Sequence, residues 1–217
     1  MSEQTTTELG DQLFDNGADG AIAALNRTYE LAFMKALRLE PANDDALGGV
    51  VRTSDALKFF DERRVALKTL AARYPNDPVV LSQLAQEGFK QEDQSASMAN
   101  VPGLADPILL FSRCTELTNK EDERYFLTLG TVLSRAGRFS EAAEAYKAVR
   151  ELRIQFEAVA TELTDDDVLC LEAECYYNAD RAEKASALLG ELGSTSEGNI
   201  KARTLREKIM LRSNGAF

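Results

Sequence analysis

The side chains that could carry chemistry in this sequence are carboxylates and thiols, because the chain contains no histidine. Histidine is the commonest general base, the usual partner of a nucleophilic serine or cysteine, and a frequent zinc ligand. Cys170 and Cys175 lie five residues apart and face different sides of a predicted helix, and the third cysteine is Cys114. No pair of carboxylates stands out as an acid–base couple. We therefore expect a protein that is not an enzyme and has no cofactor.

One acidic stretch imitates a calcium-binding loop. In DNGADGAIAALN, residues 15–26, Asp15 and Asp19 take the places of the first and third side-chain ligands. Gly17 and Asn26 stand where such a loop needs further carboxylate or amide ligands, and calcium requires six to eight oxygens. The stretch therefore predicts a turn and a helix start, and no metal site is expected.

The bulk composition bounds the class of protein. The chain has 217 residues, of which 44% are hydrophobic and 28% charged, as in an ordinary globular protein. Its net charge of -11 disfavours nucleic acid and anionic membranes as partners. No apolar run reaches the roughly 20 residues of a membrane span, and the first residues lack the features of a secretory signal. With few cysteines, these features predict a cytoplasmic protein.

Two prolines, each at the end of a predicted helix, are separated by the length of one structural repeat. The stretches FMKALRLEPAND (33–44) and LKTLAARYPND (67–77) each read as an amphipathic helix that ends at a proline. Proline stops a helix because it lacks an N–H group and clashes with the preceding turn. Pro41 and Pro75 are 34 residues apart, which is the period of a repeated helix–turn–helix unit.

The clearest such unit surrounds LGTVLSRAGRFSEAAEAY, residues 129–146. Small residues at two positions let the backbones of its helices approach, and large residues fill the space around them. The pattern resembles the tetratricopeptide repeat (TPR) family, in a divergent form that is clearest at about 123–155. It rests on Phe126, Leu129, Gly130 and Leu133 in the first helix, Gly137 and Phe139 in the turn, and Ala142, Tyr146 and Val149 in the second.

The resemblance implies an all-α fold, a right-handed α-solenoid of about four to five TPR-like helical hairpins with a C-terminal capping helix. It would form a single domain over residues 1–217. The first hairpin places Gly17 in its first helix and ends at Pro41. The expected repeats are 5–41, 44–75, 78–119 with a loop insertion at 91–107, 123–163 and 165–195, followed by a capping helix at 197–213.

Such a fold implies a scaffold or adaptor that binds a peptide segment or helix of another protein in its groove. Four groove positions are cationic, which would attract an acidic or carboxylate-ended peptide, and Phe89 and Tyr177 would be apolar anchors. The carboxylate clamp of chaperone-binding members is not matched, since Gly48 and Ser82 stand where it begins. The groove positions are Arg52, Gln86, Phe89, Lys90, Arg124, Leu127, Arg135, Glu174, Tyr177 and Asn178.

Two other functions fit the sequence. The small size and acidity also suit a dedicated chaperone of a secreted or assembling partner protein. A heptad seam in 139–163 suits a self-associating structural protein, such as a homodimer. The same seam is also explained by a long second helix that packs on its neighbours. We favour this second interpretation. Its members are Ala142, Ala145, Val149, Leu152, Phe156, Val159 and Leu163.

Overall fold

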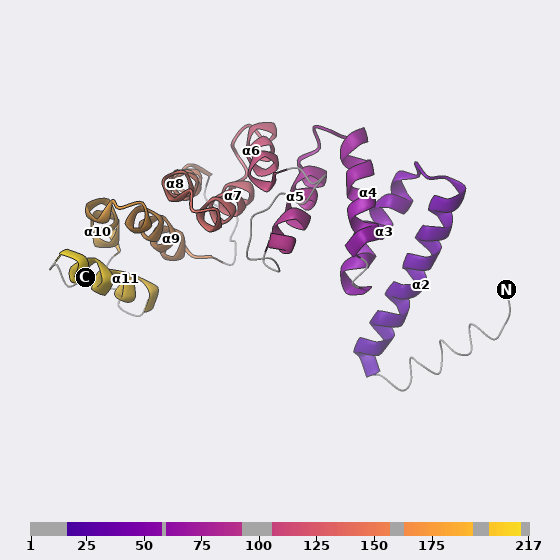
Figure 1. The fold of residues 1–217 in the computed structure, drawn as a ribbon, viewed down its shortest axis with the longest axis horizontal. Coiled ribbons are helices and arrows are strands. Elements are labelled where there is room, and N and C mark those ends of the chain that lie inside the picture. Colours follow the sequence, from indigo (N-terminus) through magenta and orange to yellow (C-terminus); the bar gives the residue numbers. More distant parts are fainter. Residues whose placement is uncertain (1–16, 58–59, 93–105, 157–162, 193–199, 214–217) are drawn as a thin grey trace. The chain divides into compact units, whose positions relative to one another are not determined.

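The computed structural model describes residues 17–57, 60–92, 106–156, 163–192 and 200–213. Within these ranges the chain forms ten α-helices and no strand (Figure 1). The sequence predicts one domain, whereas by packing the chain separates into two compact units, residues 1–87 and 88–217. The boundary falls inside α5 (Pro78–Glu92). None of the described helices has the length and apolar character of a membrane span.

Unit 1 is built on three successive helices, α2 (Gly17–Leu39), α3 (Asp44–Leu57) and α4 (Phe60–Arg73), and on the start of α5. α3 packs on both α2 and α4. The core of unit 1 is made of aliphatic side chains, because α3 and α4 each turn one apolar stripe toward the other. The buried side chains include Ala46, Leu47, Val50, Val51, Ala66, Leu67 and Leu70.

The two turns of unit 1 repeat each other at the predicted spacing. α2 and α4 both end two residues before a proline, Pro41 or Pro75, as the sequence predicts. Asn43 and Asp77 then cap the helices that follow. Each side-chain oxygen accepts a hydrogen bond from a backbone N–H of the first turn, at 2.9 Å and 2.8 Å. The 34-residue period of the sequence is thus expressed in matching helix ends and matching caps.

α2 differs from the expected first hairpin. It runs unbroken for 23 residues, from Gly17 to Leu39. A hairpin with Gly17 in its first helix and its end at Pro41 would need a turn between them, and the helix continues because no proline lies there. The described part of 5–41 therefore holds one helix, which also contains most of the stretch that imitates a calcium loop.

Unit 2 continues the hairpin pattern with six helices beyond α5. Each helix from α6 to α9 packs on the next one in the chain, and α11 packs on α9 and α10. The last helix buries Ala202 and Leu205 and exposes most of its polar residues, as a capping helix should. The helices are α6 (Pro107–Leu117), α7 (Glu123–Arg135), α8 (Phe139–Phe156), α9 (Asp165–Asn178), α10 (Ala182–Glu191) and α11 (Ile200–Ser213).

The α7–α8 hairpin has the close approach that the sequence predicts. A Cβ atom built on Gly130 would lie 2.8 Å from the ring of Tyr146, so only glycine fits there without a shift. Tyr146 is buried, and its hydroxyl shares a 3.2 Å hydrogen bond with Thr131 on α7. Gly137 makes the turn with a φ of 74°, a left-handed conformation that glycine adopts most readily.

Candidate functional site

In unit 2 the starts of α7 and α9 are bridged by a residue of α8, the helix between them in the chain. Arg153 of α8 donates hydrogen bonds to Glu123 and to Asp165, the first residues of α7 and α9, at 2.9 Å each. One guanidinium therefore holds both helix starts. Toward the other end, Arg135 of α7 and Glu174 of α9 both act electrostatically on the phenol of Tyr146. The two helices thus offer one candidate surface.

The residues that the sequence assigns to a groove on these helices remain accessible. On α7, Arg124 and Arg135 are exposed and Leu127 is half-buried. On α9, Glu174 and Asn178 are exposed and Tyr177 is half-buried. Accessible apolar and charged side chains therefore lie on two helices of one unit, α7 and α9. We call this set of six residues the α7–α9 surface.

The charges of the α7–α9 surface are partly neutralised, which the sequence analysis missed. Asp122, the N-cap of α7, accepts hydrogen bonds from the Arg124 side chain at 3.0 Å and 2.6 Å. These bonds lower the pKa of Asp122 and raise the pKa of Arg124. An acidic N-cap two residues before an arginine was the signal for this pair. The surface therefore carries mixed charge rather than a uniform positive patch.

Tyr177 is held from the side of α11. The guanidinium of Arg212 lies 5.4 Å from the centre of the Tyr177 ring and also hydrogen-bonds to Asp180. The hydrogen bond to Asp180 raises the pKa of Arg212. A guanidinium over an aromatic face is attracted by the ring's quadrupole. The capping helix therefore fixes one end of the α7–α9 surface.

The remaining groove residues are not brought to this surface by the described structure. Arg52 and Gln86 are exposed in unit 1. Phe89 and Lys90 belong to α5, but their side chains fall outside the described part. Most of the predicted insertion at 91–107 is outside it too. The placement of these four residues in a common groove stays a prediction.

The thiols are packed away from solvent. Cys114, Cys170 and Cys175 are free and buried, with exposures of 0%, 3% and 2%. Burial raises the pKa of Cys170, and it raises the pKa of Cys175 to about 11. A thiol with such a pKa is protonated at neutral pH and is a poor nucleophile. In the described residues, no cluster of three or more acidic or cysteine side chains could hold a metal ion.

The heptad seam is largely used within the chain. Ala142, Ala145 and Val149 are buried where α8 packs on α7 and α9. Near the end of α8, Ile154 and Phe156 are exposed, and Val159 lies outside the described residues. The first half of the seam is therefore occupied by neighbouring helices, as the favoured interpretation expects.

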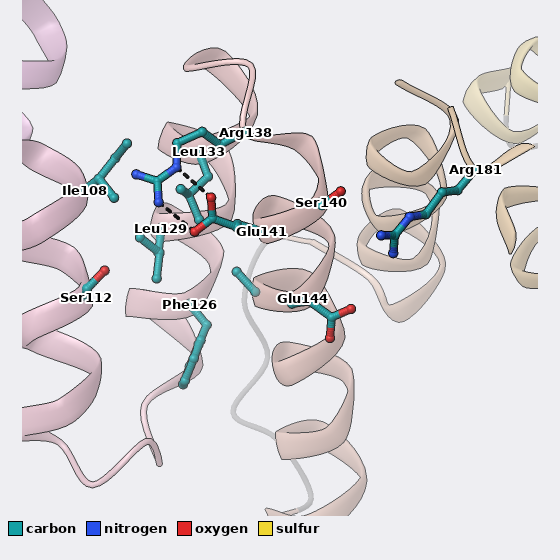
Figure 2. A pocket seen from close by; sticks show the side chains of 11 residues that line it. Ile108, Ser112, Phe126, Leu129, Leu133, Arg138, Ser140, Glu141, Glu144 and Arg181 are labelled. Atoms are coloured by element: carbon teal, nitrogen blue, oxygen red, sulfur yellow. Dashed lines mark hydrogen bonds and ion pairs between the residues drawn. The ribbon is translucent and has the colours of Figure 1, made fainter. Parts of the chain in front are cut away.

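A groove that the sequence analysis did not anticipate lies between α6 and α8, with α7 as its floor. Its volume is about 560 Å³. Figure 2 shows Arg138 joined to Glu141 at one end and Arg181 at the other. The ion pair has a length of 2.6 Å. The floor is apolar, and the rim has as many acids as bases: the lining residues are Ile108, Ser112, Phe126, Leu129, Leu133, Arg138, Ser140, Glu141, Glu144, Ala145 and Arg181.

Grooves between alternate helices recur along the chain. A groove of about 440 Å³ lies between α8 and α10, and unit 1 has one of about 490 Å³ between α2 and α4. In each case two helices form the walls and the helix between them in sequence contributes the floor. Alternate helices are not direct neighbours in a hairpin array, so their facing stripes are hard to match from sequence alone.

The chain has serial helical hairpins, a glycine packed against a tyrosine ring, and two helix caps that lie 34 residues apart. These features define a helical-repeat fold of the TPR type. No protein-family model matches the sequence, and no curated protein matches it. Several solved structures match the fold, and they cover nearly the whole chain.

The MamA protein is 20% identical to this chain, with a TM-score of 0.56 over 96% of this chain and 94% of MamA. YrrB, described as a TPR protein with an unusual peptide-binding site, is 17% identical, with a TM-score of 0.55 over 98% of this chain and 86% of YrrB. TTC0263, a TPR protein of Thermus thermophilus, is 20% identical, with a TM-score of 0.50 over 97% and 100%. The chain therefore has the TPR fold, and the all-α class expected from the sequence is confirmed.

Proposed function

We propose that this protein is a non-catalytic binding module that docks a peptide segment or helix of a partner protein on its α7–α9 surface. The observation that carries the proposal is this accessible surface, spread over two helices whose starts are fixed by Arg153. The peptide-binding site ascribed to YrrB, a protein of the same fold, supports it by analogy only.

The chemistry of the surface suits a peptide with both apolar and polar anchors. Leu127 and Tyr177 offer partly buried apolar area, which is where binding energy concentrates. Arg135 and Asn178 can donate hydrogen bonds to a carboxylate or to backbone carbonyls of the partner. An acidic or carboxylate-ended segment would meet these donors.

We further propose that the module works in the cytoplasm. Three free, buried cysteines suit a reducing compartment, where thiols are not driven to form disulfides.

The test uses paired variants of the full chain. Arg135→Glu and Leu127→Ser alter the α7–α9 surface, while Lys147→Glu of α8 and Leu109→Ser of α6 make a charge reversal and an apolar-to-serine change at exposed positions outside it. Partners captured from native lysate are identified by mass spectrometry, and their binding is then measured by calorimetry. Loss of about 1.4 kcal/mol, a tenfold weaker Kd, is expected for each surface variant. Equal weakening by Lys147→Glu and Leu109→Ser, with circular dichroism unchanged, would contradict the proposal.

A second candidate is self-association through the end of α8. Phe156 of the seam is 52% exposed and the nearby Ile154 is 83% exposed, although Ala142, Ala145 and Val149 earlier on the seam are buried. Two exposed apolar side chains on one helix end could meet their copies in a homodimer. Light scattering of the wild-type chain and of Ile154→Ser decides this, since a monomer at all concentrations rules it out.

A further inference from the structure

Unit 1 contains a groove whose walls are one stripe from each of two helices. Met34 and Leu37 of α2, and Pro41 in the turn after it, line one side at spacings of three and four residues. Val65, Ala66 and Thr69 of α4 line the other, and α3 provides the floor. The volume is about 490 Å³.

The groove leaves apolar surface uncovered by the described helices. Its floor residues Leu47 and Val50 are buried, with exposures of 3% and 0%. Its wall residues Met34 and Leu37 are only half-buried, and Val65 is 65% exposed. Covering such apolar area removes it from water, which favours the formation of a complex. The groove therefore has the features of a docking site for an apolar side-chain stripe.

The charge at one end of the groove selects the partner's chemistry. Within the described part of the chain, the only charged residues that line it are Asp61 and Glu62, in the first turn of α4. Asp61 is paired with Arg64 of the same helix at 3.4 Å. For Glu62, no salt bridge occurs among the described residues. The chain as a whole carries a net charge of -11. A cationic group of the partner would thus be attracted to this end, and an anionic lipid surface would be repelled.

We propose that this groove binds an amphipathic helix of a partner protein, with its apolar stripe on α3 and its lysine or arginine residues beside Asp61 and Glu62. The lining residues of α4 run from 61 to 69, which is about 12 Å along a helix axis. Anchors at i, i+4 and i+7 of a docked helix span a similar length. The groove lies in unit 1 and shares no residue with the α7–α9 surface of unit 2, so this proposal stands independently of the proposed function.

The experiment is a selection from a phage-displayed library of random peptides of about 16 residues, with the full chain as bait. Val65→Lys removes the exposed groove side chain and adds a repelling charge. Val79→Lys makes the same change at a position of α5 that is 56% exposed and does not line the groove. Selected peptides are synthesised with a fluorescent label, and binding is measured by anisotropy. Circular dichroism and thermal unfolding show that each variant is folded.

The expected selected sequences have apolar residues at helical spacing and lysine or arginine at one end. Their affinity should fall about tenfold or more with Val65→Lys and stay unchanged with Val79→Lys. Glu62→Gln should weaken binding about threefold at low salt, while Asp45→Asn in the first turn of α3 should not.

Four outcomes would overturn the proposal. One is that no peptide is enriched on the wild-type chain. A second is that the selected peptides are acidic. Another is equal binding to the wild type and to Val65→Lys. The last is a wild-type dimer that Val65→Lys dissociates, which would assign the groove to a second copy of this chain.

Discussion

Glu30 in unit 1 and Glu172 in unit 2 are buried to the same degree, with exposures of 1% and 2%, but they face different partners. Glu172 accepts a hydrogen bond from Arg150 at 2.9 Å, and Arg150 also reaches Glu191 at 2.7 Å. Glu30 has the hydroxyl of Thr53, and its second oxygen has no hydrogen-bond partner among the described residues. Burial raises the pKa of both carboxyls. The difference is that only one of them has a cation to offset that burial.

The hydrogen-bond geometry around Thr53 indicates which form Glu30 takes. The Thr53 hydroxyl lies within hydrogen-bond distance of Glu30 and of the Gly49 carbonyl, but it has only one proton to donate. A protonated Glu30 can donate to Thr53, which then donates to Gly49. Burial raises the pKa of Glu30 and so does nearby Glu62, while the Thr53 contact opposes them. The comparison teaches that burial without a cation shifts a carboxyl toward its neutral form.

Removing the cation of unit 2 should have the largest effect on this comparison. Arg150→Met leaves Glu172 buried without its partner, so we expect the free energy of unfolding to fall by about 3 kcal/mol at neutral pH. The loss should shrink as the pH is lowered, because the unpaired Glu172 carboxyl, whose pKa is raised by burial, then binds a proton. Urea unfolding followed by circular dichroism measures both. Arg203→Met, which breaks an exposed pair with Glu207, should cost less than about 0.5 kcal/mol. Equal losses in the two variants would sink the idea.

The two close helix approaches should also respond differently. A Cβ on Gly130 would meet the ring of Tyr146 at 2.8 Å, and one on Gly49 would meet the ring of Phe33 at 2.5 Å. Tyr146 is buried and hydrogen-bonded, whereas Phe33 is half-buried and has room to turn outward.

We therefore expect Gly130→Ala to lower the unfolding free energy by about 1.5 kcal/mol and Gly49→Ala by less than about 0.5 kcal/mol, since alanine also favours helix. Thermal unfolding of both variants checks this. The reverse order would show that unit 1 is the more rigidly packed of the two.

Neutralising Glu30 should give the smallest change, and a favourable one. The pKa of Glu30 is higher in the folded protein than in the unfolded chain. Its contribution to stability is therefore fully present at pH values below the unfolded-state pKa. That contribution is lost as the pH rises through the folded-state pKa. Glu30→Gln keeps a donor for Thr53 and should raise the unfolding free energy by about 1 kcal/mol at neutral pH. The gain should vanish below the ordinary glutamate pKa of 4.5, where the wild-type carboxyl is protonated in both the folded and the unfolded chain. A loss of stability at neutral pH would instead mean that Glu30 is needed in its charged form.

The parts of the fold that were predicted from sequence are those set by local chemistry. Pro41 and Pro75 stop helices whatever the surrounding packing is. The spacing of Gly130 and Tyr146 alone indicates one hairpin. Pairings between distant helices follow from how the helices stack. Arg150 and Glu172 are 22 residues apart, and nothing in either helix indicates that they meet. The accessible positions of the α7–α9 surface were predicted from the repeat pattern. Its charge balance was not, because the pattern ignores the N-cap that precedes it.

The burial of all three thiols has a practical consequence for experiments on this protein. Maleimide reagents attack the thiolate, and buried cysteines with raised pKa values offer very little of it. A cysteine introduced at exposed Asn178 would therefore be labelled selectively in the otherwise native chain. A fluorophore there would report directly on whatever occupies the surface of α7 and α9.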